Sequence, residues 1–363
     1  MDFYLSTNTR FHHTRPESSV ANAISILERD IKKCLIPDDS PETVIELASV
    51  TGLKTECYQI SIPDEHHLSI HAGDELGFVY GLLYLSQEYL GVQPFWFWMD
   101  QQILPKKTVA IPVGTEIASP VPAVRFRGWF LNDEVLLIHW HNGKPEDFPW
   151  HMAFEALLRC GGNMVIPGTD KASRQYEGLA SHYGLWLTHH HAQPLGAEIF
   201  ARAYPDLAPS WFQNPECFKK LWEDAVIRQK DENVIWTLGF RGQGDCPFWE
   251  SKGDEVFTTP EARGKVISDL IELQRQIVCK HIEHPVFCTN LYGEVMELYN
   301  QGHIHLHPDI IKVWADNGYG HMCTRRQDNH DARVCSLPHN GDAGPHGVYY
   351  HISFHDLQAA SHM

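Results

Sequence analysis

From residue 124 onward, short apolar segments alternate with longer segments whose apolar residues have helical spacing. Helices are expected between several of the apolar segments, for example over 151–161 and 262–282. Strand–helix alternation is typical of parallel sheets with right-handed crossovers. Seven strands are expected, and they favour a (β/α)8-type barrel over a doubly wound sheet. They cover residues 124–133, 163–168, 185–191, 233–242, 284–294, 310–317 and 347–354.

The residues before this pattern predict a separate small α/β module. Apolar spacing predicts a helix over 17–34, and another over 74–91 with Asp74 near its cap and Gly91 at its end. Strands are expected over 42–49, 56–62 and 66–73. The stretch 118–128 carries two prolines and is the expected linker. We therefore expect a small N-terminal α/β domain over 1–118 and a barrel over 119–363.

Charge and composition argue against several classes of partner and several cellular locations. The 363 residues carry a formal net charge of −17, which argues against nucleic acid and anionic membranes as partners. We expect no membrane-spanning helix, because no apolar run reaches about 18 residues. The N-terminus lacks the pattern of a secretory signal. The nine cysteines are scattered without a CxxC pair, so we expect reduced thiols and a cytoplasmic protein. The glycine-rich and serine motifs of dehydrogenases, NTPases and α/β-hydrolases are absent.

Nearly every predicted barrel strand ends in polar residues. In a (β/α)8 barrel the C-terminal strand ends face one opening, where active sites are built. The ordinary alternative is that strand ends are polar because they meet solvent. That alternative explains one or two ends well, but it explains six poorly, because several lie beside large aromatic residues. The six ends are Asn132-Asp133-Glu134, His189-His190-His191, Arg241, Tyr292 with Glu294, Asp316-Asn317, and His351.

Carboxylates are the first candidates for chemistry at this opening. Glycoside hydrolysis needs one carboxylic acid and one base or nucleophile across the sugar. Glu294 follows Tyr292-Gly293 at a strand end and is expected to point into the opening. An acid at the start of the following helix, favoured by the helix dipole, is an equally good interpretation. The further candidates are Asp133, Glu134, Asp245 and Asp316.

The loop 239–249 is the most specific local segment, with three glycines and with Arg241 four residues before Asp245. Arg241 could bind a substrate carboxylate with both arms of its guanidinium. The alternative is a structural Arg241–Asp245 pair that braces the loop.

The run His189-His190-His191 invites a metal interpretation. However, HExxH is absent and no cysteine pair supports a zinc site. Adjacent residues on one strand point to opposite faces, so only some of these histidines are expected to face the opening. We expect no metal and no cofactor.

Six segments in order resemble glycoside hydrolase family 115. They are RGWFLNDE (127–134), HHAQPL (190–195), GFRGQGD (239–245), YGEVMELYNQG (292–302), WADNGYG (314–320) and GVYYHISF (347–354). The resemblance implies a small α/β domain before a (β/α)8 barrel, and an inverting xylan α-1,2-glucuronidase that removes glucuronic acid or its 4-O-methyl ether. The chain departs from the family at Gln193, where glutamate is usual, and in Ala315 and Tyr319 of the WADNGYG segment. The family also continues far beyond the last segment, so we expect a barrel truncated after about the seventh strand, with an open seam between 124–133 and 347–354.

The resemblance also implies a site. Its catalytic residues are Glu294, which matches the family's proposed catalytic glutamate, with Glu134 and Asp133. Its substrate-binding residues are His190, Arg241, Asp245, Asn317 and His351. Glucuronoxylan and aldouronic acid oligosaccharides are the implied partners, and the oligomeric state stays open, a homodimer included. Two alternatives remain: a fragment that binds uronic acids with little or no turnover, and another exo-acting glycosidase such as a hexosaminidase-like enzyme.

Overall fold

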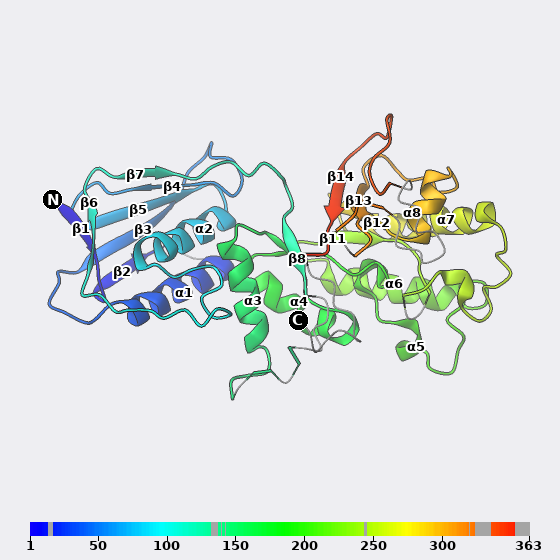
Figure 1. Cartoon of the computed structure of the whole chain (residues 1–363), viewed down its shortest axis with the longest axis horizontal. Coiled ribbons are helices and arrows are strands. Elements are labelled where there is room, and N and C mark those ends of the chain that lie inside the picture. Colours follow the sequence, from blue (N-terminus) through cyan, green and yellow to red (C-terminus); the bar gives the residue numbers. More distant parts are fainter. Residues whose placement is uncertain are drawn as a thin grey trace. The chain divides into compact units, whose positions relative to one another are not determined.

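The computed structural model describes residues 1–13, 17–131, 137–138, 140–141, 143–242, 245–318, 320–323 and 335–352. The chain divides into two compact units (Figure 1). Unit 1 comprises Met1–Phe130, Val135–Val165 and Tyr176–Trp186, and unit 2 comprises Leu131–Glu134, Ile166–Gln175 and Leu187–Met363.

Unit 1 is built on a five-stranded sheet of order β2-β3-β5-β4-β7. Its strands are β2 (Thr9–His12), β3 (Thr43–Ser49), β4 (Tyr58–Ser61), β5 (His67–Ala72) and β7 (Glu116–Ala118). β2, β3 and β5 are parallel, whereas β4 runs antiparallel to both of its neighbours. β1 (Asp2–Leu5) and β6 (Val109–Pro112) form a separate antiparallel pair.

Two helices cover one face of this sheet (Figure 1). They are α1 (Ser18–Cys34) and α2 (Glu75–Leu85), and they pack against each other. α2 begins where Asp74 accepts a hydrogen bond from the backbone of Gly77 at 2.9 Å. It continues into a π-helical turn, η1 (Ser86–Leu90), and ends at Gly91, whose φ of 77° is the left-handed conformation that glycine adopts without strain. The predicted helices, cap and terminator are confirmed, and the π turn was not foreseen.

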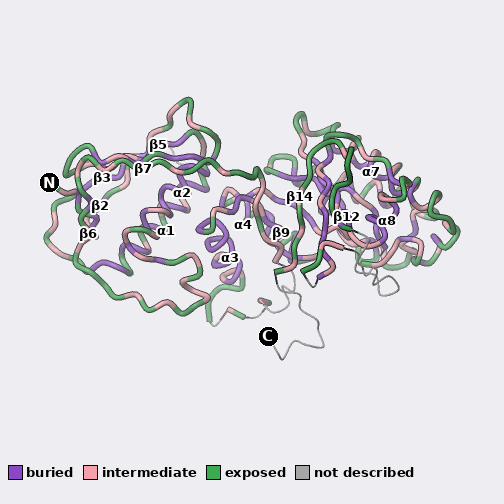
Figure 2. Tube along the Cα trace, turned by 45° about the horizontal axis from the view of Figure 1, so that its top comes forward, coloured by how far each residue is buried: buried purple, intermediate pink, exposed green. Residues whose placement is uncertain are grey.

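Helix α3 (Phe148–Arg159) is buried along nearly its whole length (Figure 2). It carries two charged side chains into the core of unit 1, Glu155 and Arg159, which are 1% and 7% exposed. Arg159 donates to Glu155 at 2.9 Å and to Asp30 of α1 at 2.5 Å, and Arg29 also donates to Glu155. Each buried charge therefore has an opposite partner, which is the condition for keeping it ionised in a core.

All seven strands predicted after residue 124 are present. β8 (Gly128–Phe130), β9 (Met164–Ile166) and β10 (Trp186–Leu187) form a sheet of order β10-β9-β8. β11 (Ile235–Leu238), β12 (Val286–Leu291), β13 (Ile311–Ala315) and β14 (His346–Tyr349) form a sheet in chain order, and its three pairs are parallel. A parallel bridge joins Leu187 to Val234.

Helices separate most of these strands along the chain. They are α4 (Asp170–His182), α5 (Phe200–Ala203), α6 (Pro215–Gln229), α7 (Pro260–Cys279) and α8 (Glu294–Asn300), with 3-10 turns η3 (Pro194–Gly196) and η4 (Phe248–Glu250). In unit 2, α7 packs on β11 and α6, and α8 packs on β12 and α7. The Thr259 hydroxyl caps α7 by accepting from the backbone of Ala262 at 3.2 Å.

The fold is mixed α/β with the predicted strand–helix alternation, and its described strands do not close into a barrel. Residues 119–127 form no helix or strand, as expected of a linker. The domain boundary at 118/119 stays a prediction. Within the described ranges, no helix has both the length and the apolar character needed to span a membrane.

The strands are shorter than predicted, and this changes where the polar residues lie. β10 ends at Leu187 and β11 at Leu238, so His189–His191 and Arg241 follow their strands rather than belonging to them. The rule that neighbouring residues alternate between faces therefore does not apply to the histidines.

Candidate functional site

The centre of the candidate site is a pair between Arg241 and Glu294 in unit 2. Arg241 follows β11, and Glu294 is the first residue of α8, just beyond β12. Arg241 Nε donates to Glu294 Oε1 at 2.8 Å, and Nη2 donates to Oε2 at 3.0 Å. The two side chains are only 7% and 6% exposed. Such a two-armed pair fixes the planes of both groups as well as their separation.

Asp245 binds the remaining arm of the same guanidinium. Arg241 Nη1 donates to Asp245 Oδ1. Burial opposes ionisation of Asp245, but the hydrogen bond and charge of His191 and the charge of Arg241 outweigh it and hold the pKa of this carboxyl well below its usual range. Asp245 is therefore a carboxylate at neutral pH, and its side chain is 40% exposed. It is the carboxylate of the cluster that solvent reaches.

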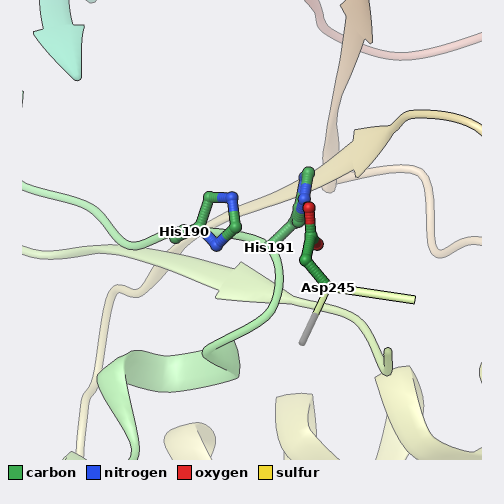
Figure 3. A group of neighbouring side chains, drawn as sticks. All are labelled: His190, His191 and Asp245. Carbon is green, nitrogen blue, oxygen red and sulfur yellow. The ribbon is translucent and has the colours of Figure 1, made fainter. Parts of the chain in front are cut away.

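Two histidines complete this cluster (Figure 3). His191 Nε2 lies 2.8 Å from Asp245 Oδ1 and 3.1 Å from Arg241 Nη1, and its ring stacks on Tyr292 with centroids 5.2 Å apart. The ring of His190 lies 4.1 Å from that of His191. Burial, with the neighbouring His191 and Arg241, lowers the pKa of His190 to about 3, although Asp245 opposes this shift. His190 is therefore neutral at physiological pH.

The positive charge of Arg241 faces two carboxylates, Glu294 and Asp245, while His190 is neutral. The Arg241–Asp245 pair that the sequence analysis kept as an alternative is present, and Glu294 joins it.

His190, His191 and Asp245 could hold a metal ion, because one ligand atom of each lies within 4.8 Å of the others. Imidazole and carboxylate are suitable ligands for Zn²⁺. Arg241 Nη1, however, already brings a positive charge to Asp245 Oδ1 and His191 Nε2. A cation there would have to displace the guanidinium, so these three residues are not arranged to favour a metal ion. The expectation of no metal stays a prediction.

The pocket beside Arg241 is lined largely by apolar side chains, with Gln193 and Glu198 as polar exceptions. Its lining includes the loop 192–194, residues 197–200, and aromatic side chains of Phe218, Trp222 and Phe240. Apolar walls of this kind lower the local dielectric and strengthen the ion pairs that they enclose.

A second cluster lies where β13 and β14 end, and it is built around Asp316. Asp316 is 1% exposed. Its Oδ1 accepts from the backbone N–H of His351 at 3.1 Å and lies 2.5 Å from His351 Nδ1. Its Oδ2 accepts from the backbone of Gly318 and Gly320 at 3.2 and 3.1 Å. Both oxygens are therefore engaged with neighbouring groups, one with His351 and the other with the turn at Gly318 and Gly320.

Asn317 begins the turn beside this cluster. Its backbone N–H donates to the carbonyl of His321 at 2.9 Å, and its Oδ1 accepts from the backbone of His321 at 3.2 Å. The turn thereby fixes the Asn317 side chain.

The predicted site residues thus fall into two groups and an undescribed remainder. Arg241, Asp245, Glu294 and His190 share the first cluster, and Asn317 and His351 share the second. Asp133 and Glu134 lie outside the described residues. The sequence analysis did not select His191, although this histidine contacts Asp245 and Tyr292. The run of three histidines was the available signal, but an assumed alternation of faces obscured it.

The family model described as glycosyl hydrolase family 115 matches residues 119–363. A solved family GH115 4-O-methyl-α-glucuronidase, described as specific for decorated arabinogalactans, aligns with a TM-score of 0.76 at 22% identity, over 96% of this chain and 49% of that chain. A search of curated proteins found no match.

Family GH20 enzymes align less closely. An exo-β-N-acetylglucosaminidase from Vibrio harveyi has a TM-score of 0.55 at 12% identity, over 87% of this chain and 55% of that chain. A chitobiase from Flavobacterium johnsoniae has a TM-score of 0.50 at 14% identity, over 86% and 52%. At these identities, the similarities to solved structures concern the fold alone. The chain spans about half the length of each of these solved relatives.

Proposed function

The chain belongs to glycosyl hydrolase family 115, and from this membership we propose that it hydrolyses glucuronic acid or 4-O-methylglucuronic acid side chains from a polysaccharide by an inverting acid/base mechanism. The observation that carries the proposal is the placement of two carboxylates, Glu294 and Asp245, on the arms of one buried guanidinium just beyond two neighbouring strands. Glycoside hydrolysis uses a pair of carboxyl groups, and active sites of (β/α)8 barrels lie at the strand ends.

Glu294 is the proposed catalytic carboxylate. An inverting mechanism needs a second carboxyl about 6.5–9.5 Å away, which leaves room for the attacking water. Glu134 and Asp133 stay the predicted partners from the sequence. Among the residues that the structure describes, Asp245 is the alternative partner of Glu294. It is bound to the same guanidinium, and it is accessible and ionised. Asp245 is accessible to an attacking water, but its lowered pKa makes it a weak base.

Arg241 is the proposed recognition group for the uronic acid carboxylate. Its guanidinium is held by Glu294 and Asp245, so the substrate anion has to share or exchange one of these partners. Exchange of Asp245 is the smaller change, because this side chain is the more exposed one. Neutral His190 and the ring of His191, stacked on Tyr292, provide hydrogen-bonding and flat surfaces for a sugar.

The proposed substrates are glucuronoxylan and its aldouronic acid oligosaccharides. The solved family relative, described as specific for decorated arabinogalactans, makes glucuronidated arabinogalactan the substrate to compare with them. The described strands do not close into a barrel, and this observation favours the second candidate, a protein that binds uronic acids without turnover.

The test is incubation of the protein with aldouronic acids, glucuronoxylan and glucuronidated arabinogalactan. Released uronic acid is measured by anion-exchange chromatography. NMR identifies which anomer is released first, before the two anomers interconvert. Release of the β-anomer from an α-linkage supports the inverting proposal. Glu294→Gln is the negative control, and an N-acetylglucosaminide tests the hexosaminidase-like alternative. Calorimetric binding of aldouronic acid without release would replace the hydrolase by the binding protein, and neither binding nor release would overturn both.

A further inference from the structure

Two of the nine cysteines face each other in the connection between β13 and β14. Cys323 and Cys335 are partners in an isolated antiparallel β-bridge. Cys335 is exposed and Cys323 partly exposed, so both thiols are accessible to a small reagent. In the described part of the chain, no other two cysteines are paired across a bridge or a strand ladder.

The hydrogen bond beside the bridge identifies the type of pair. The backbone N–H of Ser336 donates to the carbonyl of Met322 at 3.0 Å, one residue outside the bridge on each side. This pattern makes Cys323 and Cys335 a non-hydrogen-bonded pair, in which the Cα atoms are about 4.5 Å apart and the side chains are closest. Disulfides accept Cα separations of about 4.4–6.8 Å, so the pair lies within the permitted range, near its short end.

The other cysteines offer no comparable site. Cys34 and Cys288 are buried, and burial raises the pKa of both thiols, which makes them poor nucleophiles. Cys160 and Cys279 are exposed, and they serve as internal references for the reactivity of an accessible thiol.

We propose that Cys323 and Cys335 form a reversible disulfide by exchange with a small-molecule disulfide of the glutathione class. One thiolate attacks the reagent and releases one reduced thiol, which leaves a mixed disulfide on the protein. The second thiolate then attacks the protein sulfur of that mixed disulfide and expels the second reduced thiol. Two protein thiols lose two electrons and two protons, and one reagent disulfide gains them. The same exchange run backwards, with an excess of the reduced thiol, returns both cysteines to thiols.

The disulfide would tie together two segments next to the second cluster. Cys323 is two residues beyond His321, whose backbone is hydrogen-bonded to Asn317, and Ser336 already binds Met322. Oxidation would therefore brace the turn that carries Asn317, and reduction would release it. This inference does not depend on the hydrolase activity, because it rests on the two thiols alone.

A peptide map tests the proposal directly. The native protein is equilibrated with a series of reduced and oxidised glutathione ratios, quenched with an alkylating reagent and digested with trypsin. Arg325, Arg326 and Arg333 lie between the two cysteines, so the disulfide joins peptide 313–325 to peptide 334–363. We expect this joined species to form at glutathione ratios that leave Cys160 and Cys279 unlinked to any other protein cysteine.

Two comparisons separate a structural site from chance proximity along the chain. The same titration in urea is expected to give an equilibrium constant for disulfide formation at least about tenfold smaller, a ratio that corresponds to 1.4 kcal/mol. Cys335→Ser is expected to trap a glutathione mixed disulfide on Cys323, while a Cys160→Ser, Cys279→Ser double variant keeps the joined peptide. Glutathionylation of Cys323 and Cys335 without joining, a link between two chains, or equal constants in buffer and urea would overturn the proposal. The wild-type map decides the question even if a variant fails to fold.

Discussion

Both carboxylate oxygens of Glu294 accept hydrogen bonds from Arg241, at 2.8 Å from Nε and 3.0 Å from Nη2. The two residues are 53 positions apart and follow β11 and β12, which are adjacent parallel strands. Parallel register carries both side chains to the same edge of the sheet. The two bonds fix the plane of the Glu294 carboxylate, so the geometry of the site depends on how Arg241 is shared.

Replacing Arg241 by lysine tests this sharing. Lysine keeps the charge but cannot reach two oxygens with a planar fork, so we expect kcat/KM on aldouronic acids to fall by about 10–100-fold, since charge-assisted hydrogen bonds are each worth about 1.5–3 kcal/mol. Arg275→Lys, at a partly exposed arginine paired with Glu272 on the same helix, is the control, and we expect almost no effect there. The comparison substrate is the matching glucoside, which is neutral because it lacks the uronic acid carboxylate. An equal loss on this glucoside would instead identify Arg241 as a brace for the loop.

Removing the acid at position 294 tests the chemistry itself. Glu294→Gln keeps the size of the side chain but abolishes proton transfer, so turnover is expected to fall by about 10²–10⁴-fold. The unfolding free energy is expected to fall by about 1–3 kcal/mol, because one donor of Arg241 loses its buried acceptor. Glu283→Gln, at a side chain that is 89% exposed, is the matched control for both measurements. Full activity in Glu294→Gln, with a folded protein shown by circular dichroism, would remove Glu294 from the mechanism.

The order of strands and helices could be predicted because hydrophobic periodicity is a local property. The seven strands after residue 124 and the cap at Asp74 were recognised in this way. Strand lengths were overestimated, because an apolar run does not show where the ladder of hydrogen bonds stops. The segment 185–191 illustrates this, since only Trp186–Leu187 is strand. His189, His190 and His191 lie beyond its end, outside the sheet ladder.

The partners of the site residues could be predicted only in part. The Arg241–Asp245 pair was considered as an alternative, because four residues of one loop limit the choices. The bond from Arg241 to Glu294 depends on the register of β11 with β12, which no local pattern encodes. The contact between Asp316 and His351 was likewise hidden, because the two residues meet only when β14 lies beside β13.

Buried histidine makes stability depend on pH. Burial lowers the pKa of His189 to about 4, against the hydrogen bond of Gln229, which raises it. Between about pH 6.5 and 4, His189 is therefore protonated in the unfolded chain but stays neutral in the folded chain. The stabilisation is present above pH 6.5 and is lost as pH falls, with a slope of up to about 1.4 kcal/mol per pH unit.

Chemical unfolding between pH 7 and 4 measures this slope. His189→Gln is expected to be less stable at pH 7 and to depend less on pH, since it lacks the titrating ring. His284→Gln, at a side chain that is 89% exposed, should leave the slope unchanged. If the slope of His189→Gln equals that of the wild type, His189 is not the source of the dependence. His190, whose pKa is also lowered, is then the next histidine to replace.

Asp316 is predicted to act through His351. Asparagine at position 316 offers one acceptor oxygen where the carboxylate has two, so it cannot hold His351 Nδ1 and the backbone of Gly318 and Gly320 together. We expect Asp316→Asn to lower the unfolding free energy by about 1–3 kcal/mol. We also expect it to lower kcat more than it changes KM, because the ring of His351 loses its fixed orientation.

A double-mutant cycle separates positioning from simple loss of stability. If Asp316 works by orienting His351, then Asp316→Asn added to His351→Gln costs little further activity, and the two effects on kcat are far from additive. If Asp316 only holds the turn at Gly318 and Gly320, the two effects on kcat multiply. Asp309→Asn supplies the matched control, because its carboxylate also lies 2.5 Å from a histidine Nδ1, that of His307, but on the exposed surface. We expect no change in kcat there, since an exposed pair adds little order to the ring that it contacts.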